Sequence, residues 1–127
     1  MKRKDKGFTL IELVLVLLIT AILMGIAIPI YQYFLKRAKG IEAQLALREI
    51  VRLERMYYAD HDRYSDSVSD IGFSPMQPLR YYNIPTIDPI SNPNKFTARA
   101  EGNIDGDPDL DIWLINEKEI IIHLAED

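Results

Sequence analysis

The chain has no cysteine and only two histidines, His61 and His123, among its 127 residues. The lack of cysteine excludes disulfides, thiolate metal sites, thiol nucleophiles and lipid attachment through a thiol. Two histidines cannot supply the three imidazoles of an all-histidine zinc site. The sequence also lacks a glycine-rich phosphate loop, a nucleophile elbow and a paired-carboxylate signature. We therefore expect no enzymatic activity, and we expect His123 to be a surface or satisfied residue rather than a metal ligand.

Basic residues are scarce in the second half of the chain. Residues 60–127 contain fourteen acidic and five basic side chains, whereas residues 36–59 contain six basic and three acidic ones. An acidic region repels the phosphate backbone, so we do not expect nucleic acid as a partner. Arg48, Arg52 and Arg55 lie on one side of the helix expected there and form a basic ridge. The ridge is either a solvated face or a contact for an acidic region of another subunit.

One apolar run dominates the start of the chain. Phe8 to Ile30 is long enough to cross a bilayer core of about 30 Å as a helix. A secretory signal has an apolar stretch of only about 7 to 15 residues, which is shorter. An alternative is cleavage after Ala27, which would release a soluble protein starting at Ile28. That alternative gives no purpose to Glu12, a carboxylate that is costly in a membrane helix.

The residues at the start of this run form a specific motif. Lys6 to Leu13 read Lys-Gly-Phe-Thr-Leu-Ile-Glu-Leu and resemble the processing motif of type IV prepilins and type II secretion pseudopilins. In that family a membrane-embedded peptidase cuts after the glycine and methylates the new N-terminal residue. The resemblance implies cleavage after Gly7, N-methylation of Phe8 and a role for Glu12 in assembly. From the residues alone we expect the helix to begin without an ordinary cap.

The apolar run contains two helix-weakening residues, Gly25 and Pro29. Pro29 cannot donate a hydrogen bond to the carbonyl of Gly25, and glycine itself weakens a helix. Pro29 also matches the helix proline of the resembling family. The pair is either a harmless kink or a stretch that bends when filaments pack.

The chain is expected to have an α+β fold, in which a long N-terminal helix packs against a small antiparallel sheet. Its four expected parts are a leader at residues 1–7, a transmembrane or filament-core half of the helix at 8–30, an amphipathic half at 31–61, and a β-rich head at 62–127. Strands are expected at residues 79–84, 95–101, 111–116 and 119–124.

An acidic stretch precedes the only tryptophan. Asp105, Asp107, Asp109 and Asp111 recur at every second position before Trp113. Hard cations such as calcium take several oxygen ligands, so this stretch is a candidate calcium site. The flanking strands and the later positions depart from an EF-hand loop. The alternative is an acidic, solvated turn without a metal.

The resemblance implies a structural subunit. The chain would be inserted in the bacterial inner membrane with its head exported, processed by a prepilin peptidase, and assembled by an inner-membrane platform into a helical filament through self-association. One alternative is a type II secretion pseudopilin in a periplasmic pseudopilus. Another is a single-span anchored binding domain that never polymerises.

Overall fold

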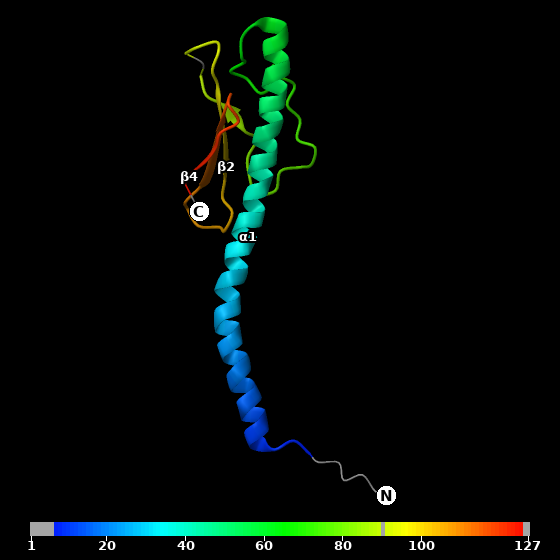
Figure 1. The fold of residues 1–127 in the computed structure, drawn as a ribbon, viewed down its shortest axis with the longest axis vertical. Coiled ribbons are helices and arrows are strands. Elements are labelled where there is room, and N and C mark those ends of the chain that lie inside the picture. Colours follow the sequence, from blue (N-terminus) through cyan, green and yellow to red (C-terminus); the bar gives the residue numbers. More distant parts are fainter. Residues whose placement is uncertain (1–6, 90, 126–127) are drawn as a thin grey trace, which may run out of the picture. The chain divides into compact units, whose positions relative to one another are not determined.

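The computed structural model describes residues 7–89 and 91–125. It contains one helix and four strands: α1 (Leu10–His61), β1 (Thr86–Ile87), β2 (Thr97–Gly102), β3 (Asp111–Asn116) and β4 (Ile121–Ala125) (Figure 1). The described chain divides into two compact units, one up to Leu35 and one from Lys36 onward. A long N-terminal helix with an antiparallel sheet confirms the expected α+β fold.

The end of α1 has a local cause. Asp62 takes a φ of 55°, the left-handed conformation that commonly terminates helices, and its N–H still donates to the carbonyl of Tyr58 at 2.9 Å. The His61 ring stacks on Tyr57 with 4.0 Å between ring centroids. The helix therefore ends at the Asp-His-Asp stretch, where the sequence predicts it.

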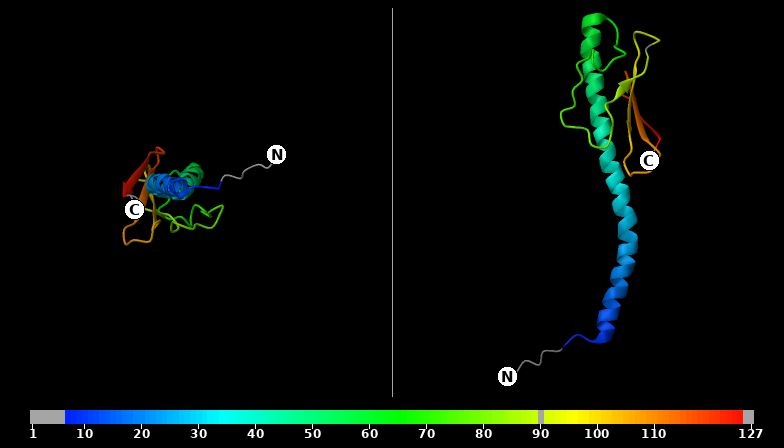
Figure 2. Two further views of the ribbon diagram at one scale, coloured as in Figure 1. Left: turned by 90° about the horizontal axis from the view of Figure 1, so that it is seen from below. Right: turned by 180° about the vertical axis from the view of Figure 1, so that it is seen from behind.

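In the unit from Lys36 onward, one face of α1 lies against the sheet (Figure 2). The helix residues buried there recur at spacings of three and four: Gly40, Ala43, Ala46, Leu47, Ile50, Val51 and Glu54. The sheet and loops add Ile71, Tyr82, Ile87, Phe96, Ala98, Ala100, Ile104 and Ile115 to this core. Small residues on the buried helix face, such as Ala43, let the helix approach the sheet closely.

The sheet has the order β1-β2-β3-β4, with every neighbouring pair antiparallel. Buried Ala98 and Ala100 alternate with half-buried residues along β2, because successive side chains of a strand point to opposite faces of the sheet. Ala98 pairs with Ile115, and Ile115 pairs with Ile121, so the core-facing residues of three strands form one row. A register shift lies between Ile112 and Trp113 in the β3–β4 ladder.

The prediction of a strand at residues 79–84 is wrong. This segment makes only an isolated bridge between Tyr82 and Gly102, and a two-residue strand, β1, forms further along the chain. The reason is Glu42 on α1, whose carboxylate accepts the N–H groups of residues 80, 81 and 82 at 2.9, 3.0 and 3.2 Å. A helix side chain therefore takes the donors that a strand would give to its ladder.

The bridge at Gly102 requires a residue without a side chain. A Cβ atom there would lie 2.2 Å from the carbonyl oxygen of Tyr81, which no real contact reaches.

The strand expected at 119–124 begins at Ile121 because Glu119 takes a φ of 61° in the preceding turn. The strand expected at 95–101 also begins later than predicted, because β2 starts at Thr97.

Candidate processing and assembly site

A capping box starts α1. The Thr9 hydroxyl oxygen accepts the N–H of Glu12 at 3.3 Å, and the Glu12 carboxylate accepts both the N–H and the hydroxyl of Thr9 at 3.3 Å. These reciprocal bonds satisfy donors that a helix N-terminus leaves unpaired. The expectation of a helix without an ordinary cap is wrong. The sequence carries the signal for this cap, because threonine followed three residues later by glutamate is the capping-box pattern.

No described neighbour requires a glycine at position 7. A Cβ atom on Gly7 would meet no described atom within 4 Å. Phe8 is 81% exposed and precedes the first helical residue, Leu10. Within the described chain, no packing contact therefore selects a glycine followed by an exposed phenylalanine.

The apolar part of α1 has no partner within the described chain. Its most apolar 18-residue stretch has a mean hydropathy of 2.9 and no buried residues, and by length and composition the helix can cross a membrane. The Thr20 hydroxyl donates to the carbonyl of Val16 at 2.7 Å, which satisfies the one polar side chain of residues 13–30 inside the helix itself. An apolar surface of this extent requires lipid or protein to cover it.

α1 continues without interruption through Gly25 and Pro29. A Cβ atom on Gly25 would meet nothing within 4 Å, so no described neighbour requires a glycine there. The carbonyl of Gly25 lacks its usual donor because Pro29 has no N–H. The predicted role of the two residues in bending the helix stays a prediction.

Asp111 is buried and is not part of an exposed acidic loop. We use the term hub for its carboxylate together with the three side chains bonded to it. The residue is 1% exposed, and its carboxylate accepts the Tyr82 hydroxyl, the Trp113 Nε1–H at 2.5 Å and the His123 Nε2 hydrogen at 2.5 Å. The rings of Trp113 and His123 stack with 4.0 Å between centroids. Burial and the hydrogen bond to Asp111 raise the pKa of Tyr82. Three donors satisfy a carboxylate that would be costly to bury alone.

The other three aspartates of the candidate calcium site have different partners. Asp105 forms an ion pair with Lys36 at 2.8 Å and accepts the N–H of Asp107 at 3.2 Å. Asp107 in turn accepts the N–H of Asp109 at 2.8 Å. These local bonds are Asx turns, the usual way in which aspartate shapes a loop.

The structure does not bring the four aspartates together. Nowhere in residues 7–89 and 91–125 does a group of three or more histidine, aspartate or glutamate side chains have an arrangement that would hold a metal ion. The calcium site stays a prediction, and Asp111 is already committed to three protein donors. Sequence reasoning missed this hub, although alternation along β3 puts Asp111 on the same face as buried Ile115.

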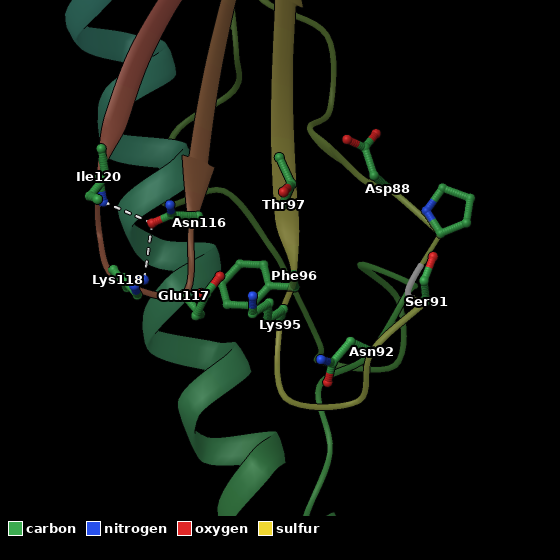
Figure 3. Close-up of a pocket in the computed structure, with 11 residues that line it drawn as sticks. Asp88, Ser91, Asn92, Lys95, Phe96, Thr97, Asn116, Glu117, Lys118 and Ile120 are labelled. Atoms are coloured by element: carbon green, nitrogen blue, oxygen red, sulfur yellow. Dashed lines mark hydrogen bonds between the residues drawn. The ribbon is translucent and has the colours of Figure 1, made fainter.

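An open pocket of about 490 Å³ lies between the loop before β2 and the β3–β4 turn (Figure 3). The Asn116 side-chain oxygen accepts the N–H groups of Lys118 at 3.0 Å and Ile120 at 3.1 Å, which shapes the turn. The charged groups of its lining include Asp88 and Lys95. The lining residues contain no histidine or cysteine and no nucleophile–base pair, so this pocket gives no support to catalysis.

Two of the three arginines in the basic ridge are paired within the chain. Arg52 contacts Glu49 at 2.6 Å and Arg55 contacts Glu119 at 2.8 Å. Arg48 is exposed. The ridge therefore offers less free positive charge to another subunit than its sequence implies.

Comparison with known proteins connects these features. The family model described as "Prokaryotic N-terminal methylation motif" matches residues 2–28. The fold is similar to the high-resolution structure of a type IV pilin from Shewanella oneidensis, with a TM-score of 0.51 and 18% identity over 71% of this chain and 93% of that one. The chain thus combines a prepilin-type N-terminus with a type IV pilin fold.

Sequence relatives point the same way. The type IV major pilin protein PilA of Myxococcus xanthus is 41% identical over 78 residues, which cover 61% of this chain and 36% of that protein. The type IV wide pilus major component PilA4 of Thermus thermophilus is 38% identical over 65 residues, covering 51% and 50%. The chain spans about a third to a half of the length of these two relatives. The chain is similar in sequence to type IV pilins, and these relatives are named as pilins rather than as enzymes.

Proposed function

We propose that the chain is a structural subunit of a type IV pilus-type filament, made as a membrane precursor and then processed. The observation that carries this proposal is the N-terminal motif placed directly before a helical stretch whose apolar side chains are all exposed. The names of the relatives, which are pilus components, support the same assignment.

In this proposal a prepilin peptidase removes the leader, residues 1–7, and methylates Phe8. The structure supports the idea because no described residue packs against Gly7 in a way that requires a glycine. A residue that makes no packing contact of this kind is available for recognition by an enzyme. The leader would lie in the cytosol and the head, residues 62–127, would be exported across the bacterial inner membrane.

Assembly would then bury the exposed apolar helix surface, residues 8–30, against other copies, with Gly25 and Pro29 allowing the helix to bend and an inner-membrane platform guiding insertion. Cleavage gives Phe8 a positively charged amine one helical turn before Glu12. An unpaired charge inside an apolar bundle is costly, so the Glu12 carboxylate of a neighbouring copy would neutralise the incoming amine. That pairing would fix the axial register of the subunits.

Two other functions predict different behaviour for the same residues. A type II secretion pseudopilin would share the processing but assemble in a periplasmic pseudopilus. A single-span anchored binding domain would need neither the Gly7 cleavage nor the Glu12 charge.

The N-terminus of the mature chain tests the processing step. Mass spectrometry of the membrane and filament fractions should show Phe8 as the first residue, with a methylated amine. A chain starting at Met1 or Ile28 would contradict the proposal. Replacing Gly7 with valine should leave the precursor uncut, whereas the matched change Gly25→Ala should leave the cleavage unaffected.

A further inference from the structure

Glu54 is a glutamate in the core of the unit that begins at Lys36. Its side chain is 0% exposed and lies on the helix face that also buries Leu47, Ile50 and Val51. Glutamate is almost never fully buried unless it is paired. The processing, assembly and sheet contacts described above make no use of this residue.

The contacts of Glu54 suit a neutral carboxyl better than a charged one. One oxygen, Oε2, accepts the N–H of Ser65 at 2.9 Å, and the other, Oε1, has no hydrogen-bond partner among the described residues. A buried carboxylate needs a cation or several donors, and a single N–H is too few. Burial raises the pKa of Glu54 to about 7, the Ser65 N–H opposes this rise, and the negative charge of Asp66 adds to it.

In the part of the chain that the structure describes, no cation lowers the pKa of the Glu54 carboxyl. Arg55, the next residue along α1, pairs with Glu119 of the β3–β4 turn at 2.8 Å instead. On the segment that covers Glu54, the charged group that acts on the carboxyl is Asp66, which has the same sign. Tyr64 of that segment also has a pKa raised by burial, so it is neutral over the relevant range.

The segment over Glu54 is residues 62–73, which we term the covering segment. It is anchored on both sides of Ser65: the Tyr64 N–H donates to the carbonyl of Pro93 at 3.0 Å, and Ile71 is buried in the core. Ser65 itself is 4% exposed. A cavity of about 170 Å³ is lined by Ser65, Tyr57 and Asp66 among others.

We propose that Glu54 is a proton-operated latch, which holds the covering segment closed on α1 while its carboxyl is protonated and lets the segment open when it ionises. An ionised Glu54 needs water or further donors, and opening at Ser65 admits water from the adjacent cavity. The direction follows from linkage: the closed form binds the proton more tightly than the open form, so rising pH favours opening. In an exported head, the surface carrying Arg63 and Asp66 would respond to the external pH. That consequence rests on the proposed function, whereas the latch itself does not.

Hydrogen exchange of the full chain in non-ionic detergent tests the latch without requiring assembly. Deuterium uptake of peptides covering residues 62–73 is measured at pH 5, 6, 7 and 8 for the wild type and for Glu54→Gln. Dividing the two rates at each pH cancels the intrinsic pH dependence of exchange. The ratio should rise about tenfold between pH 6 and pH 8 and flatten above pH 8, given a pKa of about 7 closed and 4.5 open.

Glu49→Gln is the matched control, because Glu49 lies on the same helix but is paired with Arg52 at its surface. Its exchange should follow the wild type at every pH. A wild-type to Glu54→Gln ratio that does not change with pH overturns the latch. If Glu54→Gln fails to fold, carbon-13 NMR of the wild-type carboxyl decides: a midpoint near pH 7 supports the latch, and one near pH 4.5 overturns it.

Discussion

The two units of this chain use the same residue types in opposite ways. Leu17 and Leu47 are on the same helix, yet Leu17 is 61% exposed and Leu47 is 0% exposed. The unit from Lys36 onward has a buried core of its own, and Leu47 is part of it. The unit up to Leu35 leaves almost all of its apolar side chains uncovered. One unit is thus stabilised by its own packing, and the other has a surface suited to lipid or to further copies of the chain.

The largest expected effect contrasts the two leucines directly. Leu47→Ala should lower the free energy of unfolding of the unit from Lys36 onward by about 2 to 5 kcal/mol, because it removes fully buried methyl groups and leaves a cavity. Leu17→Ala should change that free energy by less than about 0.5 kcal/mol, because nothing in the described chain packs on it. Denaturant titration of both variants in detergent measures the difference. Equal losses of unfolding free energy in the two variants would contradict the distinction between the two units.

Asp111 and Asp109 provide a second contrast, inside the head. Asp111→Asn should destabilise the head by about 1 to 3 kcal/mol, since the hub then lacks an acceptor for one of its donors. Asp109→Asn changes an exposed loop residue and should stay within about 0.5 kcal/mol of the wild type. Thermal unfolding followed by the fluorescence of Trp113 measures both. If the two variants unfold at indistinguishable temperatures, the structural role assigned to Asp111 is wrong.

Variants of Asp109 and Asp111 also test the prediction of a calcium site. A site formed by Asp105, Asp107 and Asp109 would raise the melting temperature in millimolar calcium but not in magnesium, by ligand linkage. Asp109→Asn should abolish that rise, whereas Asp111→Asn should leave it intact. Wild-type midpoints that calcium does not shift would identify the stretch as an acidic turn.

The smallest effect concerns the basic ridge. Arg52 and Arg55 are in exposed ion pairs, which contribute little to stability because solvent screens them. Replacing either with glutamine should therefore barely change the stability of the unit from Lys36 onward. A loss above about 2 kcal/mol would show that the ridge holds the unit together.

Periodicity in the sequence was sufficient for much of this fold. The spacing of Leu47, Ile50 and Val51 predicts the buried helix face, and alternation predicts β2. The error at residues 79–84 arose from Glu42, a distant helix residue that captures three backbone donors. No local pattern in that segment reveals such a contact.

Three site features show different limits of sequence reasoning. The Thr9–Glu12 cap follows a standard sequence pattern, threonine followed three residues later by glutamate, so the sequence alone is sufficient to predict it. The inward position of Asp111 follows from strand alternation once β3 is placed. Glu54 lies at helical spacing from Leu47 and Ile50, which puts it on the apolar face, but the covering segment that seals it is a tertiary feature.

The charge on Glu12 is the most direct test of filament assembly. Glu12→Gln removes the charge but keeps a side chain that can complete the capping box, whereas Thr9→Ala weakens the cap and keeps the charge. Both variants, with the wild type, are expressed and separated into membrane-bound and sheared-filament fractions. The account predicts that Glu12→Gln accumulates in the membrane, is cut after Gly7 and yields few or no filaments, while Thr9→Ala still assembles. Wild-type amounts of filament from Glu12→Gln alone would contradict the pairing of Glu12 with the Phe8 amine.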